Sequence, residues 1–368
     1  MKTNPLKKLG DIGQSIWLDY IRCDLISSGE LRRLIEEDGI RGLTSNPAIF
    51  EKAIAESKLY DKDIQEMALA KKNTKAIYET LSQRDVQNAA DIFRALYKET
   101  NGADGYVSLE VNPHLAYDTK GTIEEARSLW TALNRPNVLI KVPATTEGLP
   151  AIQELISEGI NINVTLIFGL PRYRQVAEAF IIGLERRVNK MESITNIASV
   201  ASFFLSRIDT FVDPLLVTEN LNIEKANKVK GQVANSSAKV AYQTYKEIFG
   251  STRFKKLINK GAHTQRLLWA STGNKNPAYN DLKYIEPLIG PETVSTVPLE
   301  TINAYREHGN PKPRLEANLK QALMVLDILK DLGINIDIIT QQLEDEGVKK
   351  FIEPFDKLIF SIKNKSLV

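Results

Sequence analysis

The chain has few of the residues on which several kinds of chemistry depend. It contains one cysteine, Cys23, so it forms no internal disulfide, which points to a reducing, cytoplasmic compartment. Its three histidines, His114, His263 and His308, lie far apart and lack the spacing of metal ligands. The sequence has no Gly-x-Gly-x-x-Gly motif and no P-loop. We therefore predict neither a metal nor a bound cofactor.

Charge of one sign and long apolar runs are also lacking. The formal net charge is +2, and no dense basic patch interleaved with aromatic residues argues for nucleic-acid binding. No apolar run approaches the roughly 18 residues that a membrane helix needs, and residues 1–10 lack the apolar core of a signal peptide. The composition, 43% hydrophobic and 26% charged, is that of a globular protein with a sizeable core.

Short β-branched runs alternate with longer helical patterns along the chain. This alternation indicates βαβ units and a parallel sheet, and eight such units predict an α/β fold, a (β/α)8 barrel of the TIM type. We expect a single barrel domain over residues 1–368, because α/β barrels of this size fold as one unit. The runs that predict strands are residues 16–21, 41–46, 106–111, 138–143, 162–168, 194–202, 266–271 and 293–298.

Two connections are too long for one helix and predict extra helices around the barrel. Residues 47–105 would hold three helices, including a long one near 75–99. Residues 203–265 would hold at least two, including one at 224–248. A further helix is expected after the eighth strand, at about 299–308.

Beyond that helix the chain changes character. Asn310–Pro313 contains two prolines and breaks the pattern, and apolar residues at helical spacing follow it. We predict that residues 310–368 form a helical cap on the barrel. The last helix is apolar enough that it must bury one face, against the barrel or against a second subunit, so monomer and homodimer both remain open.

A lysine interrupts one of the strand-like runs. Lys141 lies in the middle of residues 138–143, where desolvation would disfavour its charged form. A neutral amine can attack a carbonyl and form a Schiff base. The alternative is a lysine at a strand end that reaches water along its aliphatic stem. The residues on neighbouring strands shift the balance toward the amine nucleophile.

Polar residues stand late in seven of the predicted strands. In barrels the catalytic groups come from the C-terminal ends of the strands, and residues two apart in a strand face the same way. A packed interior would consist of Val, Ile and Leu, so this pattern predicts one site surrounded by side chains. The late polar residues are Asp19, Thr44, Asn46, Ser108, Glu110, Lys141, Asn163, Thr165, Ser202 and Ser271.

These residue types support chemistry at a carbonyl carbon. Lys141 would be the nucleophile, and Asp19 and Glu110 would move protons directly or through a water. Thr165 and Asn163 would position that water. Asn46 and Ser108 would then be left to bind sugar hydroxyls.

Structural roles are the alternative for each residue. Asp19 and Glu110 would merely neutralise a buried lysine, and Thr165 would be only a β-branched strand residue. Thr44 and Ser45 would cap the helix that starts at Pro47, and Asn46 would take part in the same cap.

Two cations that follow strands six and seven indicate a phosphate site. Arg207 and Lys275 lie where barrels often bind phosphate, with backbone N–H groups and a helix N-terminus nearby. A guanidinium holds phosphate oxygens in fork geometry. The alternative for Arg207 is a surface ion pair with Asp209 or Asp213.

Two segments resemble signatures of the transaldolase family. Residues 42–50 are similar to its first signature, with Leu43 where valine or another small residue is usual. Residues 138–155 are similar to its active-site lysine signature, with Lys141 in place. The resemblance covers about residues 10–365 and is greatest to the longer bacterial subfamily, which also occurs fused to glucose-6-phosphate isomerase. Further family positions are matched by Asp19, Glu110, Asn163 and Thr165.

The resemblance implies a transferase of the pentose phosphate pathway. It would move a dihydroxyacetone unit from sedoheptulose 7-phosphate or fructose 6-phosphate to glyceraldehyde 3-phosphate or erythrose 4-phosphate, through a Schiff base on Lys141. Glu110, through a water held by Thr165, would shuttle protons during Schiff-base formation. Asp19 would deprotonate the hydroxyl whose collapse breaks the carbon–carbon bond.

The resemblance also implies a set of substrate-binding residues, with one departure from the family. Many relatives place an arginine just after the strand-seven serine, but here Thr272–Asn274 follow it, and Lys275 is the nearest cation. An ammonium is a point charge and not a fork, so Lys275 would bind phosphate less specifically. The implied substrate-binding residues are Asn46, Ser108, Asn163, Ser202, Arg207, Ser271 and Lys275.

Two other functions fit the same residues. One is a class I fructose 6-phosphate aldolase that releases dihydroxyacetone to water. It would differ in how well water is excluded from the intermediate, and Phe204 near the mouth is a weak indication of exclusion. The other is a sugar-phosphate-binding barrel without catalysis, which would form no covalent imine.

Overall fold

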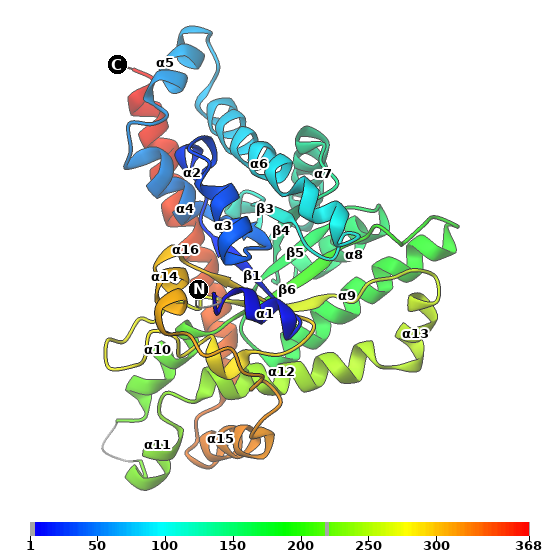
Figure 1. Cartoon of the computed structure of the whole chain (residues 1–368), viewed down its shortest axis with the longest axis vertical. Helices are drawn as coiled ribbons and strands as arrows, with labels where there is room; N and C mark the ends of the chain where they lie inside the picture. The colour runs from blue at the N-terminus through cyan, green and yellow to red at the C-terminus, as the bar shows by residue number, and fades with distance from the viewer. Residues whose placement is uncertain (1–3, 218–220, 368) are drawn as a thin grey trace.

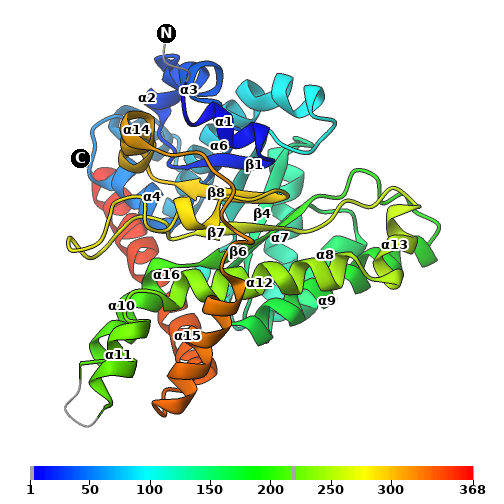
Figure 2. The ribbon, with the colours of Figure 1, turned by 60° about the horizontal axis from the view of Figure 1, so that its bottom comes forward.

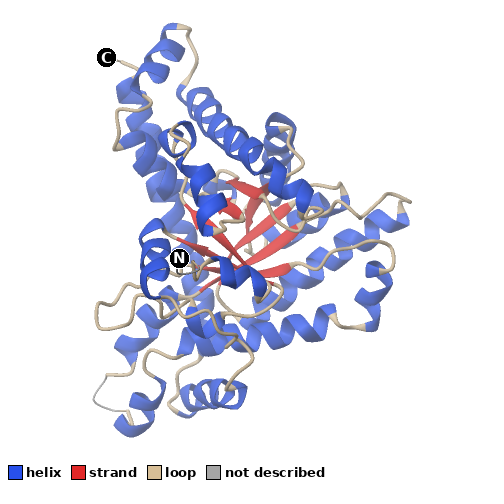
Figure 3. Cartoon of the chain, viewed as in Figure 1, coloured by secondary structure: helices blue, strands red, loops and turns tan. Residues whose placement is uncertain are grey.

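Eight parallel strands form a closed barrel at the centre of the computed structural model, which describes residues 4–217 and 221–367 (Figure 3). Each strand pairs in parallel with the next along the chain, and β1 also pairs with β8, which closes the sheet. The predicted (β/α)8 barrel is confirmed. The strands are β1 (Gln14–Asp19), β2 (Gly42–Thr44), β3 (Tyr106–Glu110), β4 (Val138–Pro143), β5 (Ile162–Ile167), β6 (Ser199–Phe204), β7 (Arg266–Ala270) and β8 (Thr293–Val297).

Helices surround the barrel on all sides (Figures 1 and 3). The α-helices are α1 (Lys7–Asp11), α2 (Cys23–Ser27), α3 (Glu30–Asp38), α4 (Pro47–Phe50), α5 (Asp61–Leu69), α6 (Thr74–Glu99), α7 (Thr119–Leu133), α8 (Gly148–Ser157), α9 (Leu170–Asn189), α10 (Ser206–Leu215), α11 (Ile223–Val229), α12 (Val233–Phe249), α13 (Thr252–Ile258), α14 (Leu299–His308), α15 (Leu319–Asp331) and α16 (Ile336–Lys365). A π-helix, η1 (Glu51–Ala55), continues α4, and two short 3₁₀ helices are η2 (Pro113–Leu115) and η3 (Glu286–Leu288).

The strands are buried on both faces because helices cover the outside and side chains fill the inside. Every residue of β4 and β5 is buried, and Trp17 and Trp269 are fully buried. Trp17 also explains why β2 begins with glycine. A Cβ atom at Gly42 would lie 2.6 Å from the indole ring, so any larger residue would displace the tryptophan.

Four predicted elements differ from the structure by two residues or more. β1 covers Gln14–Asp19 and not residues 16–21. β6 begins at Ser199 and not at residue 194, because Ile194 and Ile197 belong to the preceding loop, although their apolar side chains are buried. The helix expected at 224–248 is divided into α11 and α12, with Gly231 between them at φ +69°. β2 ends at Thr44 because the chain turns there into α4. The long helix near 75–99 is confirmed as α6.

The two C-terminal helices lie in different places. Helix α15 packs against α11 and α12 at the side of the barrel (Figure 2). Helix α16 contacts α4, η1, β5 and α10, and it runs beside α4 and α5 to the C-terminus (Figure 1). The apolar face of α16 is therefore buried against the barrel and its extra helices.

Specific contacts hold helix α16 against the rest of the protein along its length. Near its start, Glu344 forms an ion pair with Arg172 of α9 at 2.9 Å, and only 4% and 12% of these side chains are exposed. Gly347 allows close approach, because a Cβ atom there would lie 2.9 Å from Leu166 of β5. At the other end, Lys365 donates to the carbonyl of Ile54 at 2.9 Å and lies 2.7 Å from an oxygen of Asp61.

We predict that Glu344→Ala lowers the free energy of unfolding by about 3–5 kcal/mol, because it leaves the charge of Arg172 largely buried without its partner. Urea denaturation measures this change. The control is Glu346→Ala on the same helix, which removes an exposed pair with Lys350 and should cost at most about 1 kcal/mol. Equal losses in the two variants would show that the buried pair does not fasten α16.

Candidate active site

A cavity of about 730 Å³ opens at the C-terminal ends of the strands. Its walls come from several strand ends, from the loop after β7, and from α10, α14 and α16. Glu110, Thr165, Ser108 and Asn163 do not line this cavity and are buried in the barrel. The predicted site residues that line it are Asp19, Asn46, Lys141, Ser202, Arg207, Ser271 and Lys275.

Lys141 is held inside the barrel rather than extended to bulk water, with 5% of the residue exposed. The parallel register places it beside Glu110 of β3 and Asn163 of β5. Its Nζ lies 3.4 Å from Glu110 Oε2 and donates to the carbonyl of Ser45 at 3.1 Å. The ring of Phe351 lies 5.5 Å away. The amine is thus positioned on one side by a carboxylate and screened on another by an aromatic ring.

Glu110 is a buried acid poised for proton transfer. Burial raises its pKa to about 7, against the opposing effect of Lys141 and with a smaller contribution from the charge of Asp19. Its two oxygens are buried and accept no hydrogen bond from the described residues. A carboxyl group with a pKa near neutrality can both accept and return a proton during one catalytic cycle.

Asp19 stands at the end of β1 on the cavity floor. Its Oδ1 accepts a hydrogen bond from Thr44 Oγ1 at 2.7 Å. Burial raises the pKa of Asp19, while Lys141 and the Thr44 hydrogen bond oppose that rise. The charge of Lys141 therefore acts on both Asp19 and Glu110, but the two carboxyl groups have different hydrogen-bond partners. Different environments allow two carboxyl groups in one site to serve two roles.

The helix cap after β2 belongs to Asn46 alone. Its Oδ1 accepts from the backbone N–H of Ile49 at 3.1 Å, and only its NH₂ group is left to donate into the cavity. Thr44 bonds to Asp19 instead, and Ser45 donates to the carbonyl of Ser108 at 2.7 Å. The alternative in which Thr44 and Ser45 cap the helix is therefore wrong.

Three predicted binding residues form one hydrogen-bonded chain across β3, β5 and β6. Asn163 donates to Ser108 Oγ at 3.0 Å, and Ser202 donates to Asn163 Oδ1 at 2.7 Å. Ser108 and Asn163 are fully buried, whereas Ser202 lines the cavity. The structure brings the three together, and direct contact of Ser108 and Asn163 with a substrate stays a prediction.

Thr165 lies in a distorted part of β5. The pairing of β5 with β6 shifts register between Val164 and Ile167, and Leu166 adopts φ +62°. A leucine in the left-handed region is strained, and such strain gathers at functional sites. The hydroxyl of Thr165 is buried and has no partner among the described residues. An unpaired buried hydroxyl costs about 1–3 kcal/mol, which favours a functional role over a purely structural one.

Arg207 lies in the first turn of α10 and forms part of the cavity wall. Its Nη1 is buried without a partner among the described residues, its guanidinium lies 5.6 Å from the Phe204 ring, and burial lowers its pKa. The predicted alternative, an ion pair with Asp209 or Asp213, is wrong. Asp209 accepts from the backbone N–H of Ala234, and Asp213 accepts from the backbone N–H of Gly231.

The loop after β7 completes this wall. Ser271 adopts φ +53° and its Oγ lies 2.8 Å from Ser206 Oγ, at the start of α10. Lys275 lines the cavity from the first part of the same loop. Arg207, Ser271 and Lys275 therefore face one space, although they come from two different connections.

Three of the cavity residues that sequence reasoning missed bear on the site's chemistry. Thr296 obeys the same late-strand rule as the predicted residues and was detectable in β8. Lys350 and Phe351 belong to α16, and no local signal placed that helix over the strand ends.

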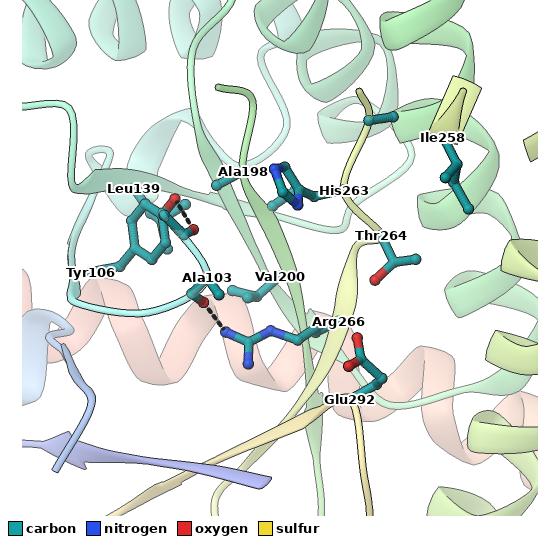
Figure 4. Close-up of a pocket in the computed structure, with 13 residues that line it drawn as sticks. Ala103, Tyr106, Leu139, Ala198, Val200, Ile258, His263, Thr264, Arg266 and Glu292 are labelled. Carbon is teal, nitrogen blue, oxygen red and sulfur yellow. Dashed lines mark hydrogen bonds between the residues drawn. The ribbon is translucent and has the colours of Figure 1, made fainter. Parts of the chain in front are cut away.

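A second cavity, of about 290 Å³, lies at the opposite, N-terminal ends of the strands (Figure 4). Arg266 extends across it, and donates to the carbonyl of Ala103 at 2.6 Å, to Asp104 at 3.0 Å and to Ser15 at 2.9 Å. Its guanidinium is therefore engaged by the protein. None of the predicted site residues lies in this cavity.

Within residues 4–217 and 221–367 no three His, Cys, Asp or Glu side chains form a group that could hold a metal ion. In the same part of the chain no helix is both long and apolar enough to cross a membrane.

A closed (β/α)8 barrel with a buried amine beside carboxylates at its strand ends is the arrangement of barrel enzymes that act on carbonyl compounds through a lysine. The chain belongs to one family of this class, the transaldolase/fructose-6-phosphate aldolase family, whose model matches residues 16–362.

Curated relatives match the chain over nearly its whole length. A protein named transaldolase from Trichodesmium erythraeum (strain IMS101) is 51% identical, covering 99% of this chain and 98% of its own. Transaldolase 2 from Nostoc punctiforme is 48% identical with the same coverage. A transaldolase from Thiobacillus denitrificans is 43% identical, covering 98% of this chain and 99% of its own.

We predict that kcat/KM rises with pH through about 7, the pKa of Glu110. The carboxyl group is charged above its pKa, and only the charged form accepts the proton released as Lys141 attacks. The measurement is kcat/KM between about pH 6 and 8, the range over which such a group titrates. Glu110→Gln should lose the rise and about 10²–10⁴-fold of activity.

The matched control for this prediction is Glu125→Gln. Burial also raises the pKa of Glu125, but Glu125 does not line the candidate cavity. Its variant should keep the wild-type pH profile. A rise that persists in Glu110→Gln would assign the titration to another group.

Proposed function

We propose that this enzyme catalyses the transaldolase reaction of the pentose phosphate pathway. A dihydroxyacetone unit would pass from sedoheptulose 7-phosphate or fructose 6-phosphate to an aldose phosphate through a Schiff base on Lys141. The observation that carries this proposal is the buried Lys141 amine, 3.4 Å from Glu110, in a cavity whose wall presents the unpaired guanidinium N–H of Arg207.

Schiff-base formation is the first step. The Glu110 carboxylate first takes a proton from the Lys141 ammonium; the neutral nitrogen then attacks the ketose carbonyl carbon, and the carbonyl oxygen takes up that proton to become a hydroxyl. Loss of that hydroxyl as water then leaves the iminium. Glu110 accepts the proton released from the amine and returns it to the departing hydroxyl, through a water held by Thr165. The buried Thr165 hydroxyl, which has no partner among the described residues, and the Glu110 carboxylate 3.4 Å from the Lys141 amine support this assignment.

Carbon–carbon cleavage is the second step. Asp19 takes the proton of the hydroxyl on the departing carbon, the one of the two bonded carbons that leaves with the aldose phosphate. That hydroxyl becomes an aldehyde, and the electron pair of the broken bond moves into the iminium to give an enamine on Lys141. The aldose phosphate leaves. An acceptor aldose phosphate reverses these events, with Asp19 now donating the proton.

The remaining predicted residues would hold the substrate. Asn46 and Ser202 line the cavity and would bind the dihydroxyacetone unit through the Asn46 NH₂ group and the Ser202 hydroxyl, with Ser108 and Asn163 in the chain behind Ser202. Arg207, Ser271 and Lys275 would bind the phosphate, with the N-terminus of α10 adding a favourable dipole. A single cysteine supports a cytoplasmic location.

Transfer requires that the enamine outlast exposure to water, which separates this function from a fructose 6-phosphate aldolase. Phe351 lies 5.5 Å from Lys141 Nζ, and Phe204, 6% exposed, lies 5.1 Å from Phe168. The Phe351 ring beside the amine and the Phe204 ring in the cavity wall support transfer over release. The test measures free dihydroxyacetone from fructose 6-phosphate with and without erythrose 4-phosphate. Transferred product should dominate with the acceptor, and equal release in both would indicate the aldolase.

We predict that Lys141→Arg folds but loses essentially all turnover, because a guanidinium keeps the charge and cannot form the imine. The assay measures transfer per folded protein, with circular dichroism as the check on folding. Lys239→Arg is the matched control, since Lys239 is 9% exposed and lies outside the cavity. Near-wild-type turnover in Lys141→Arg would reject this lysine as the nucleophile.

We predict that Arg207→Ala lowers kcat/KM for fructose 6-phosphate by about tenfold to a hundredfold, the worth of one charge-assisted hydrogen bond. The loss should fall mainly on KM and should be small for fructose, which has no phosphate. Lys275→Ala should show the same selectivity more weakly. Equal losses on both substrates would mean that these residues support the fold; selectivity in Lys275→Ala alone would move the phosphate to the loop after β7.

A further inference from the structure

The Thr296 hydroxyl of β8 is connected to Asp19, the proposed proton acceptor, through the hydroxyl of Thr44. Thr296 and Thr44 belong to β8 and β2, which flank β1 on its two sides. Their Oγ1 atoms lie 2.6 Å apart, across the end of β1. Thr44 Oγ1 then donates to Asp19 Oδ1 at 2.7 Å. Three adjacent strands therefore contribute one continuous hydrogen-bonded row.

The direction of the row follows from counting protons. A threonine hydroxyl carries a single proton, and that of Thr44 is committed to Asp19. Thr296 must therefore donate to Thr44. A hydroxyl that accepts one hydrogen bond becomes a better donor in the next, so the chain strengthens the contact to a charged carboxylate. The same arrangement fixes the rotamer of Thr44 and hence the position of Oδ1.

Thr296 is itself held in place. Its backbone carbonyl accepts a hydrogen bond from Thr272 Oγ1 at 2.7 Å, and 4% of the residue is exposed. Being β-branched, it has few side-chain rotamers available in a strand. Nothing in the interior of the barrel requires a hydroxyl here, since valine has nearly the same shape.

We propose that Thr296 is a positioning residue for the cleavage step, which acts through Thr44 to orient Asp19 and to stabilise its charged form. This inference rests on the proposed function of Asp19 as the group that takes the proton from the substrate hydroxyl. It adds β8 to the strands that build the site.

Several charged groups act on Asp19 besides this row. Lys141 of β4 and Lys275 of the loop after β7 stabilise its charged form. Glu300 of α14 opposes ionisation, and Glu110 of β3 is the other carboxyl group that interacts with it. These groups stay in place when Thr296 is changed, so a shift in the titration of Asp19 reports the hydroxyl row.

The test compares Thr296→Val with Thr296→Ser. Carbon-13 NMR of protein labelled at the aspartate carboxyl groups, with Asp19→Asn for assignment, measures the pKa of Asp19 in each. Thr296→Val should raise that pKa by about 0.5–1 unit, the equivalent of one net hydrogen bond. It should also slow ketose cleavage by about three- to tenfold with little change in KM. Thr296→Ser, which restores the hydroxyl, should restore both.

The matched control is Thr293→Val, the same substitution at the other end of β8. Thr293 is fully buried and its hydroxyl bonds to Gly290 and Gln14, away from the cavity. It should leave the Asp19 pKa unchanged.

Three outcomes would overturn the proposal: an unchanged Asp19 pKa in Thr296→Val, a loss confined to KM, or the same shift in Thr293→Val. A shifted pKa in an enzyme that cleaves no ketose would leave the hydroxyl row standing and reject the proposed function instead.

Discussion

The burial of the Lys141 amine beside Glu110 is the constraint on which the rest of the site depends. Removing an ammonium and a carboxylate from water costs several kcal/mol for each ion, and their attraction repays this only with good geometry and further hydrogen bonds. Here the separation is 3.4 Å, and Glu110 accepts no hydrogen bond from the described residues. In an ion pair that mainly stabilised the fold, the carboxylate oxygens would accept further hydrogen bonds. The arrangement instead places a carboxyl group with a pKa of about 7 beside the amine, where it can take up and return a proton.

Other parts of the molecule keep that pair in place and out of water. The parallel register of β3 and β4 sets Glu110 opposite Lys141. Helix α16 brings Phe351 over the amine, and the Arg172–Glu344 pair and the glycine contact at Leu166 hold that helix on the barrel. The distortion of β5 beside Thr165 lies against the same helix. The strained backbone at Leu166, the buried Arg172–Glu344 ion pair and the close approach at Gly347 thus all lie where α16 packs on the barrel.

How much the sequence predicted depends on whether the signal was local. Strand alternation is local, so the late polar residues Asp19, Glu110 and Lys141 were found and do come together. Apolar runs report burial and not backbone geometry, which is why Ile194 and Ile197 extended β6 too far. Which of several neighbouring polar residues caps a helix depends on the direction of each side chain. The sequence therefore did not show that Asn46 caps α4 and that Thr44 bonds to Asp19 instead. The position of Phe351 depends on the path of a 30-residue helix, which tertiary contacts set.

The central claim is that the Lys141 amine becomes covalently bound to the substrate carbon. The most direct test is reduction with borohydride in the presence of fructose 6-phosphate, followed by protease digestion and mass spectrometry of the peptides. The account predicts one modified peptide, with the added mass of a reduced dihydroxyacetone or ketose phosphate unit on Lys141. An adduct on another lysine, or no adduct in a protein that turns over the sugar phosphate, would contradict it.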